Sequence, residues 1–334
     1  MKAPRAFSSS VGVAITSYLT LKQALGRKYV NETNILAHLD SRLASERPCA
    51  STLTSESFTA WCLTFTHLAP TVRRNWMRVV RNLCLYMRRS DPVCFVPDPN
   101  LFPTRHAAVR PHIFTEQQIV QILAIAARLR ARGNSPLCPE VFRLAIVLLY
   151  TAGLRRGEVV RLVRSDYDAA EHTLRIRASK FHKSRLVALS NDATREMEAY
   201  LRARGRLRRA PQNANAPLLV TGRNGRRAYS GPSLANRLRV VFRQAGVRTV
   251  SGRVARIHDL RHTFAVHTLL RWYRSGLDVQ AKLPALSAAM GHVSIASTAY
   301  YLSLIAPVAE AASALFERHC HDMLAGTTRV GGAQ

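Results

Sequence analysis

The chain of 334 residues carries 49 Lys and Arg against 20 Asp and Glu, which gives a formal net charge of +29. A compact protein with this imbalance repels itself unless a polyanion neutralises it, so the composition indicates nucleic acid as the partner. The charge is spread along the sequence, which disfavours an anionic membrane surface. The longest apolar run, Leu144 to Tyr150, is much shorter than the roughly 18 residues of a membrane span. Polar residues interrupt the N-terminal stretch, so we expect no signal peptide there.

The six cysteines form no C-x-x-C pair, which is typical of free thiols in a reducing cytosol rather than of a disulfide framework. The run His319-Cys320-His321 has the composition of a metal site. Adjacent side chains on a helix point in different directions, however, and no second ligand pair is near in the sequence. We therefore expect no metal site and no cofactor.

Residues 1–96 are predicted to form a small helical domain that binds DNA, because apolar residues between Val11 and Arg89 recur at spacings of three and four. Its last helix separates two kinds of side chain. The apolar side carries Trp76, Val79, Val80, Leu83 and Met87, and the basic side carries Arg74, Arg78, Arg81 and Arg88. We predict that the basic side lies along DNA phosphates, with a solvated basic face as the alternative.

Residues 97–112, which contain several prolines, are predicted to be a linker, and residues 113–334 a second domain. Thr115 and Gln118 have the spacing of a capping box. The run Val141 to Tyr150 predicts a buried helix that ends near Gly153. Alternating residues predict a β-hairpin, and periodic segments predict further helices. The hairpin strands are 172–178 and 185–189, and the helices are 191–206, 231–245, 258–272, 283–290 and 307–324. The fold class is thus mainly α with a small antiparallel sheet.

Three short segments, far apart in the sequence, carry the candidate chemistry. The first runs from Thr151 to Glu158 and presents Arg155 after a turn that Gly153 permits. The second, 258–265, places His258 and Arg261 three residues apart, on one helical face. The third begins at Met290-Gly291-His292 and ends at Tyr300-Tyr301, with Ile295 between them as an expected core anchor.

With these segments in this order, the sequence resembles the tyrosine recombinases, also called phage-integrase-like enzymes. Their signature is an arginine in T-G-L-R-x-x-E, then H-x-L-R-H, then L-G-H followed nine residues later by tyrosine. The resemblance covers roughly 113–317, and residues 1–96 look like the family's core-binding domain. The family also uses a lysine on a β-hairpin, a place that Lys180 occupies. Three residues differ from those usual in the family's motifs: Ala152, Ala188 and Met290. None of these differences removes a side chain with a predicted catalytic role.

Cleavage of a DNA phosphodiester without metal needs positive charge on the nonbridging oxygens, a nucleophile, and an acid for the departing 5′ oxygen. Arg155 and Arg261 can grip the phosphate as planar forks. The resemblance implies that Tyr301 attacks phosphorus to give a 3′-phosphotyrosyl enzyme, so that no ATP is needed. It assigns Lys180 as the acid, His258 as a group that helps take the tyrosine proton, and His292 as a donor to the phosphate. Glu158 and Asp259 are expected to orient arginine or histidine side chains.

Tyr300 is the alternative nucleophile, although the spacing from His292 and the following Leu302 favour Tyr301. Two alternative functions also stay open: a DNA-binding accessory protein that does not catalyse, and a type IB topoisomerase. The amino-acid sequences of the three segments favour a recombinase that recognises specific DNA sites.

The resemblance implies double-stranded DNA with specific recombination sites as the partner, and a homo-oligomer that is tetrameric on DNA. The predicted helix Pro307 to Leu324 would dock on a neighbouring protomer or pack within its own domain. We expect a cytoplasmic, nucleoid-associated protein. Its role in transposition, integration or resolution stays open, and so does the participation of sister recombinases.

Overall fold

The computed structural model describes residues 6–45, 52–104, 110–131, 133, 135–177, 184–207 and 210–303. The chain divides into two compact units, Met1–Val109 and Arg110–Gln334. The division falls within the stretch 97–112 that contains the prolines. None of the described helices is long and apolar enough to cross a membrane.

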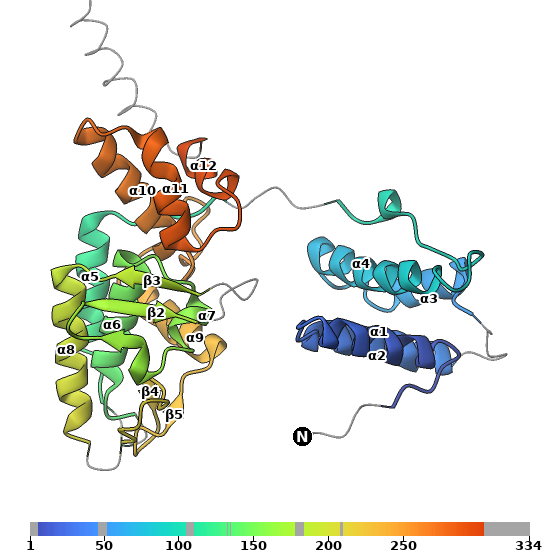
Figure 1. The fold of residues 1–334 in the computed structure, drawn as a ribbon, viewed down its shortest axis with the longest axis horizontal. Coiled ribbons are helices and arrows are strands. Elements are labelled where there is room, and N and C mark those ends of the chain that lie inside the picture. Colours follow the sequence, from blue (N-terminus) through green and yellow to red (C-terminus); the bar gives the residue numbers. More distant parts are fainter. Residues whose placement is uncertain are drawn as a thin grey trace, which may run out of the picture. The chain divides into compact units, whose positions relative to one another are not determined.

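The N-terminal unit is helical in its described part (Figure 1). Its elements are α1 (Gly12–Ala24), α2 (Val30–Ala44), α3 (Ser55–Leu63), α4 (Pro70–Met87) and the 3-10 turn η1 (Pro99–Leu101). The periodic apolar residues meet in one core, in which Ile15, Leu39 and Leu83 are fully buried. Trp61 lies at the centre of this core with a ring-centroid distance of 4.6 Å to Phe65.

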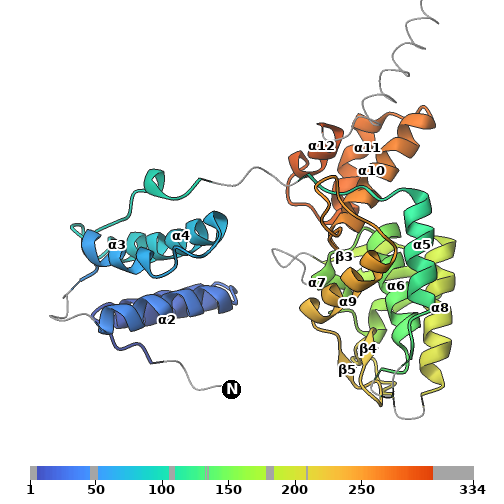
Figure 2. The ribbon, with the colours of Figure 1, turned by 180° about the vertical axis from the view of Figure 1, so that it is seen from behind.

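The C-terminal unit is built around α6 (Cys138–Thr151), the most apolar segment of the sequence, whose residues from Leu144 to Leu149 are all buried. Helix α6 packs against α5 (Glu116–Ala127), α8 (Asn191–Gly205) and α10 (Asp259–Arg274). Figures 1 and 2 show α6 from both sides between these neighbours. The remaining elements are α7 (Arg156–Val159), η2 (Arg164–Asp166), β4 (Val220–Thr221), β5 (Arg227–Ala228), α9 (Gly231–Gln244), α11 (Val279–Met290) and α12 (Ala296–Ser303).

The predicted hairpin is present as β2 (Thr173–Ile176) and β3 (Arg185–Ala188), which pair antiparallel with Leu174 opposite Val187. A two-residue strand, β1 (Tyr167–Asp168), pairs with the other edge of β2. The alternating residues Leu174, Ile176 and Val187 are buried, which fixes the register of the hairpin. The prediction of a mainly helical fold with a small antiparallel sheet is therefore confirmed. The tip of the hairpin, 178–183, and the predicted helix 307–324 lie outside the described residues.

Helices α10, α11 and α12 share a smaller core of their own. Its buried members are Ala265, Val266, Leu269, Val279, Leu283, Leu286, Met290 and Tyr301. This packing fixes the segment from Met290 to Tyr301 against the helix that carries His258 and Arg261.

Candidate active site

Arg155 is placed by a turn that favours glycine. Gly153 ends α6 with φ +58, and a Cβ atom there would lie 2.3 Å from Cδ1 of Phe264 on α10. A side chain at this position would therefore be strained and would also clash. The turn delivers Arg155 as the N-cap of α7, as the sequence predicted.

The buried carboxylate of Glu158 holds two arginines. It accepts hydrogen bonds from Nη1 of Arg155 at 2.9 Å and from Nη1 and Nη2 of Arg185 at 3.1 and 2.9 Å. The Arg155 backbone N–H also donates to it, at 2.9 Å. Burial by itself raises the pKa of Glu158, but the hydrogen bonds from Arg185 and Arg155 outweigh burial and lower that pKa to about 2. Glu158 thus bonds the guanidinium groups of both arginines, and Arg185, which was not singled out in the sequence, is its second partner.

Arg261 is 1% exposed and is held by main-chain carbonyls. Its guanidinium donates to the carbonyl of Gly153 and, over 2.6 Å, to that of Met290. Burial, together with the charge of Arg155, lowers the pKa of Arg261 to about 9. The first and second sequence segments therefore meet directly at this side chain.

The C-terminal end of α11 joins all three segments. The carbonyls of Ala289, Met290 and Gly291 accept hydrogen bonds from Arg185 at 2.7 Å, from Arg261 at 2.6 Å and from Arg155 at 2.7 Å, respectively. Terminal carbonyls of a helix lack partners within the helix and carry its negative dipole end, so three cations are stabilised there. Gly291 has φ +67, and a Cβ atom on it would lie 2.8 Å from Nη1 of Arg185, which accounts for glycine at this position.

His292 follows this turn and faces the tyrosine. Its Nδ1 lies 2.7 Å from Oγ1 of the buried Thr298, and its ring stacks on that of Tyr301 with a centroid distance of 6.3 Å. Burial and the neighbouring arginines lower the pKa of His292 to about 4. The expectation that Ile295 anchors this segment is wrong, because its side chain is 49% exposed. The buried Thr298 contributes the anchor instead, through a hydrogen bond.

The two adjacent tyrosines differ sharply in environment. Tyr301 is 3% exposed, whereas Tyr300 is 39% exposed. The Tyr301 hydroxyl lies 2.9 Å from Nδ1 of His262, a residue of the second segment for which the sequence predicted no role. Its position four residues after His258, hence on the same helical face, was the available signal. Burial raises the pKa of the Tyr301 phenol.

His258 stands at the solvent-exposed N-cap of α10. Its ring meets that of His262 edge-on at a centroid distance of 4.7 Å. Partial desolvation of the ring by its neighbours, and next the charge of Arg261, lower the pKa of His258. Asp259, beside it, is fully buried and pairs with Arg256 at 2.9 Å, so it fixes the start of α10.

Comparison with known proteins places this arrangement in a family. The profile of the phage integrase family matches residues 112–306. The chain belongs to this family. A putative integrase/recombinase of Sinorhizobium fredii, y4rB, is 31% identical over 92% of this chain and 98% of its own length. The tyrosine recombinase XerC of Chlamydia pneumoniae is 32% identical over 48% of this chain and 46% of its own length.

Solved structures share the fold. The integrase of transposon Tn1549 in complex with transposon right-end DNA superposes with a TM-score of 0.62 at 17% identity, covering 91% of this chain and 98% of that chain. A lambda integrase dimer bound to a COC′ core site gives 0.56 at 16% identity, covering 86% and 94%. The family match and the sequence relatives show that the protein is a tyrosine recombinase, an enzyme of DNA recombination. This confirms the function predicted from the sequence, and the two alternatives are not favoured.

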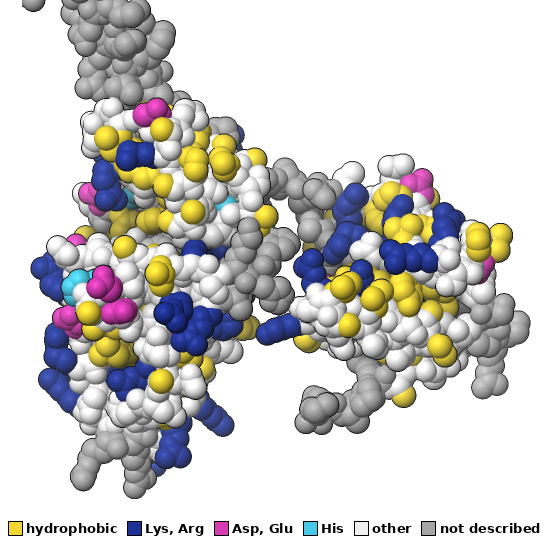
Figure 3. All heavy atoms as spheres, in the orientation of Figure 1, with side chains coloured by type: hydrophobic (Ala, Val, Ile, Leu, Met, Phe, Trp, Pro, Cys, Tyr) yellow, Lys and Arg dark blue, Asp and Glu magenta, His cyan; other side chains and the backbone are white. Residues whose placement is uncertain are grey.

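Two of the four arginines on the basic face of α4 form hydrogen bonds within the N-terminal unit. Arg74 donates to the carbonyl of Pro103 at 3.0 Å and Arg88 to that of Cys94 at 3.1 Å, so both hold the segment that follows α4. Arg78 is exposed and Arg81 is half-buried. In Figure 3, groups of Lys and Arg side chains are scattered over the visible surface of each unit, where Asp and Glu are few. Lys180 lies outside the described residues.

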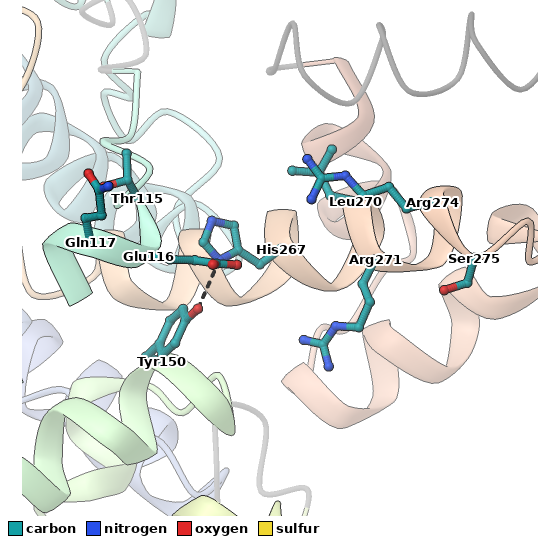
Figure 4. Close-up of a pocket in the computed structure, with 9 residues that line it drawn as sticks. All are labelled: Thr115, Glu116, Gln117, Tyr150, His267, Leu270, Arg271, Arg274 and Ser275. Carbon is teal, nitrogen blue, oxygen red and sulfur yellow. Dashed lines mark hydrogen bonds between the residues drawn. The ribbon is translucent and has the colours of Figure 1, made fainter. Parts of the chain in front are cut away.

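A cavity of about 730 Å³ lies beside the later turns of α10. Its lining includes Glu116, Tyr150, His267, Arg271 and Arg274 (Figure 4). The Tyr150 hydroxyl and Nδ1 of His267 lie 3.0 Å apart. None of the predicted catalytic residues within the described part of the chain lines this cavity.

Proposed function

We propose that this recombinase cleaves and rejoins DNA strands at specific sites through a 3′-phosphotyrosyl intermediate at Tyr301. Arg155 and Arg261 form the clamp on the scissile phosphate. The observation that carries the proposal is the attachment of both guanidinium groups to successive carbonyls at the end of α11, the helix that leads to Tyr301. A clamp fixed in this way needs no reorganisation when negative charge develops on the nonbridging oxygens.

The exposed His258 is proposed to contact the scissile phosphate, and so is His292, whose ring lies beside that of Tyr301. Lys180, in the segment that joins the two hairpin strands, is proposed to protonate the departing 5′ oxygen. Arg185, the first residue of β3, anchors the hairpin to Glu158 beside that segment. The DNA partner is double-stranded, with Arg74, Arg78, Arg81 and Arg88 of α4 as candidate phosphate contacts. The net charge of +29 supports a polyanionic partner.

Strand exchange needs several protomers, so we propose a tetramer on DNA, with the segment 307–324 docking on a neighbouring protomer. Transposon-encoded relatives of the fold support a role in a mobile element. The protein would then act in the cytoplasm on the nucleoid.

A pool of nicked duplexes with randomised centres tests the nucleophile, because the departing fragment diffuses away and traps the covalent adduct. Tyr301→Phe should bind the pool and give no adduct, whereas the matched control Tyr300→Phe should retain it. Sequencing the trapped strands would give the DNA site. Adduct formation by Tyr301→Phe would overturn the assignment.

A further inference from the structure

The hydroxyl of the proposed nucleophile is held by one histidine, and it is not the histidine expected from the sequence. Tyr301 Oη lies 2.9 Å from Nδ1 of His262, with the two rings 5.6 Å apart between centroids. Among the described residues, no hydrogen bond joins His258 to Tyr301. His258 stands one turn earlier, at the exposed end of α10, where solvent or a phosphate can reach it.

We propose that His262 is the catalytic proton acceptor for Tyr301 and that His258 serves the phosphate instead. This rests on Tyr301 as the nucleophile. The neutral His262 ring, with its proton on Nε2, accepts the hydrogen bond from the phenol through Nδ1. As the bond from Tyr301 Oη to phosphorus forms and the bond from phosphorus to O5′ breaks, the phenol proton moves to Nδ1. The leaving oxygen takes its proton from the general acid.

The environment of the two groups fits this assignment. Tyr301 is buried, which raises the pKa of its phenol, so the hydroxyl is protonated at neutral pH and needs an acceptor. Burial, and next the adjacent His258, lower the pKa of His262 to about 4, so its ring is neutral in the free protein. A neutral imidazole within hydrogen-bond distance is the form that can act as a general base.

The same helix carries a second pair of the same kind, which serves as an internal control. His267 Nδ1 lies 3.0 Å from the hydroxyl of Tyr150. That pair faces the cavity of Figure 4. It joins α10 to α6, and neither arginine of the clamp lines that cavity. His267→Ala therefore removes a histidine–tyrosine hydrogen bond of α10 without removing a group proposed to contact the reacting atoms.

The test measures single-turnover adduct formation on the nicked duplex. His262→Asn places an amide oxygen near the position of Nδ1, so it can still accept the hydrogen bond but cannot take the proton. We expect His262→Asn and His262→Ala to be slowed alike, by about 10²-fold or more, as general-base effects go. His267→Ala should cleave at the rate of the unmodified protein.

A ring-fluorinated tyrosine at position 301, whose phenol ionises near neutral pH, removes the need for a base. It should restore His262→Asn to within a few-fold of the otherwise unmodified fluorinated protein and leave His258→Ala slow. Normal rates for His262→Asn, or rescue of His258→Ala instead, would overturn the inference while leaving Tyr301 as the nucleophile. Adduct formation by Tyr301→Phe would instead overturn the proposed function itself.

Discussion

Replacing Glu158 by glutamine tests whether one buried carboxylate organises the arginine clamp. The side chain is 1% exposed, and only as an anion can both of its oxygens accept hydrogen bonds from Arg155 and Arg185 at the same time. Its pKa falls from an ordinary 4.5 to about 2. At about 1.4 kcal/mol for each pKa unit, the ionised form stabilises the fold by roughly 3 kcal/mol. An amide would also point its own N–H groups at guanidinium donors.

Glu158→Gln should therefore lower the free energy of unfolding of the C-terminal unit by about 3 kcal/mol at neutral pH. Because the folded-state pKa is lowered, this stabilisation is present above pH 4.5 and is lost as the pH falls toward 2. Urea denaturation of the two proteins should show a difference that shrinks across this interval. The clamp also loses its anchor, so adduct formation should fall.

Glu198→Gln is the matched control, since that carboxylate is 44% exposed and lies 3.8 Å from Arg202. Surface pairs of this kind contribute about 0 to 1 kcal/mol. A loss below 1 kcal/mol for Glu158→Gln, or a loss that does not change between pH 5 and pH 3, would refute the reasoning.

Three further predictions concern other parts of the molecule. Gly153→Ala should lower the unfolding free energy by at least about 2 kcal/mol through backbone strain and the clash with Phe264, whereas Gly205→Ala, which meets no atom within 4 Å, should be neutral or stabilising in urea titrations. If 6 to 10 cations contact phosphates, binding measured across a salt series should fall with a log–log slope of roughly −5 to −9, and salt-independent binding would contradict this. Lys180→Ala should be slowed by about 10²-fold on ordinary DNA and be rescued when sulfur replaces the bridging 5′ oxygen, because a thiolate leaves without an acid; rescue of Lys183→Ala instead would relocate the acid.

The sequence predicted those parts of the fold that depend on local pattern. Spacing of apolar residues located the helices, and alternation located the hairpin, since each pattern reflects which face of an element is buried. Gly153 was predicted to make its turn because few other residues adopt a positive φ. Ile295 shows the limit of such patterns, because an apolar residue in a short connection is buried only if another element covers it.

The site was predictable in its residue types but not in its connections. Backbone carbonyls carry no sequence signature, so the attachment of three arginines to the end of α11 could not be read from the chain. Arg74 and Arg88 matched a phosphate-binding stripe, yet both bond carbonyls of the segment after α4. His262 lay on the face of His258, but only the position of α12 decides which of the two rings meets Tyr301.

The net positive charge of the arginine clamp affects how readily the proposed base, His262, takes up a proton. Three guanidinium groups and one carboxylate, those of Arg155, Arg185, Arg261 and Glu158, leave a formal excess of two positive charges around the end of α11. In the free protein this excess helps to keep the nearby histidines neutral. A bound phosphate supplies the missing negative charge, which favours protonated imidazole. On this reasoning, the ring that takes the tyrosine proton becomes a stronger base once DNA occupies the clamp, so the proposed nucleophile is deprotonated most readily when its target is in place.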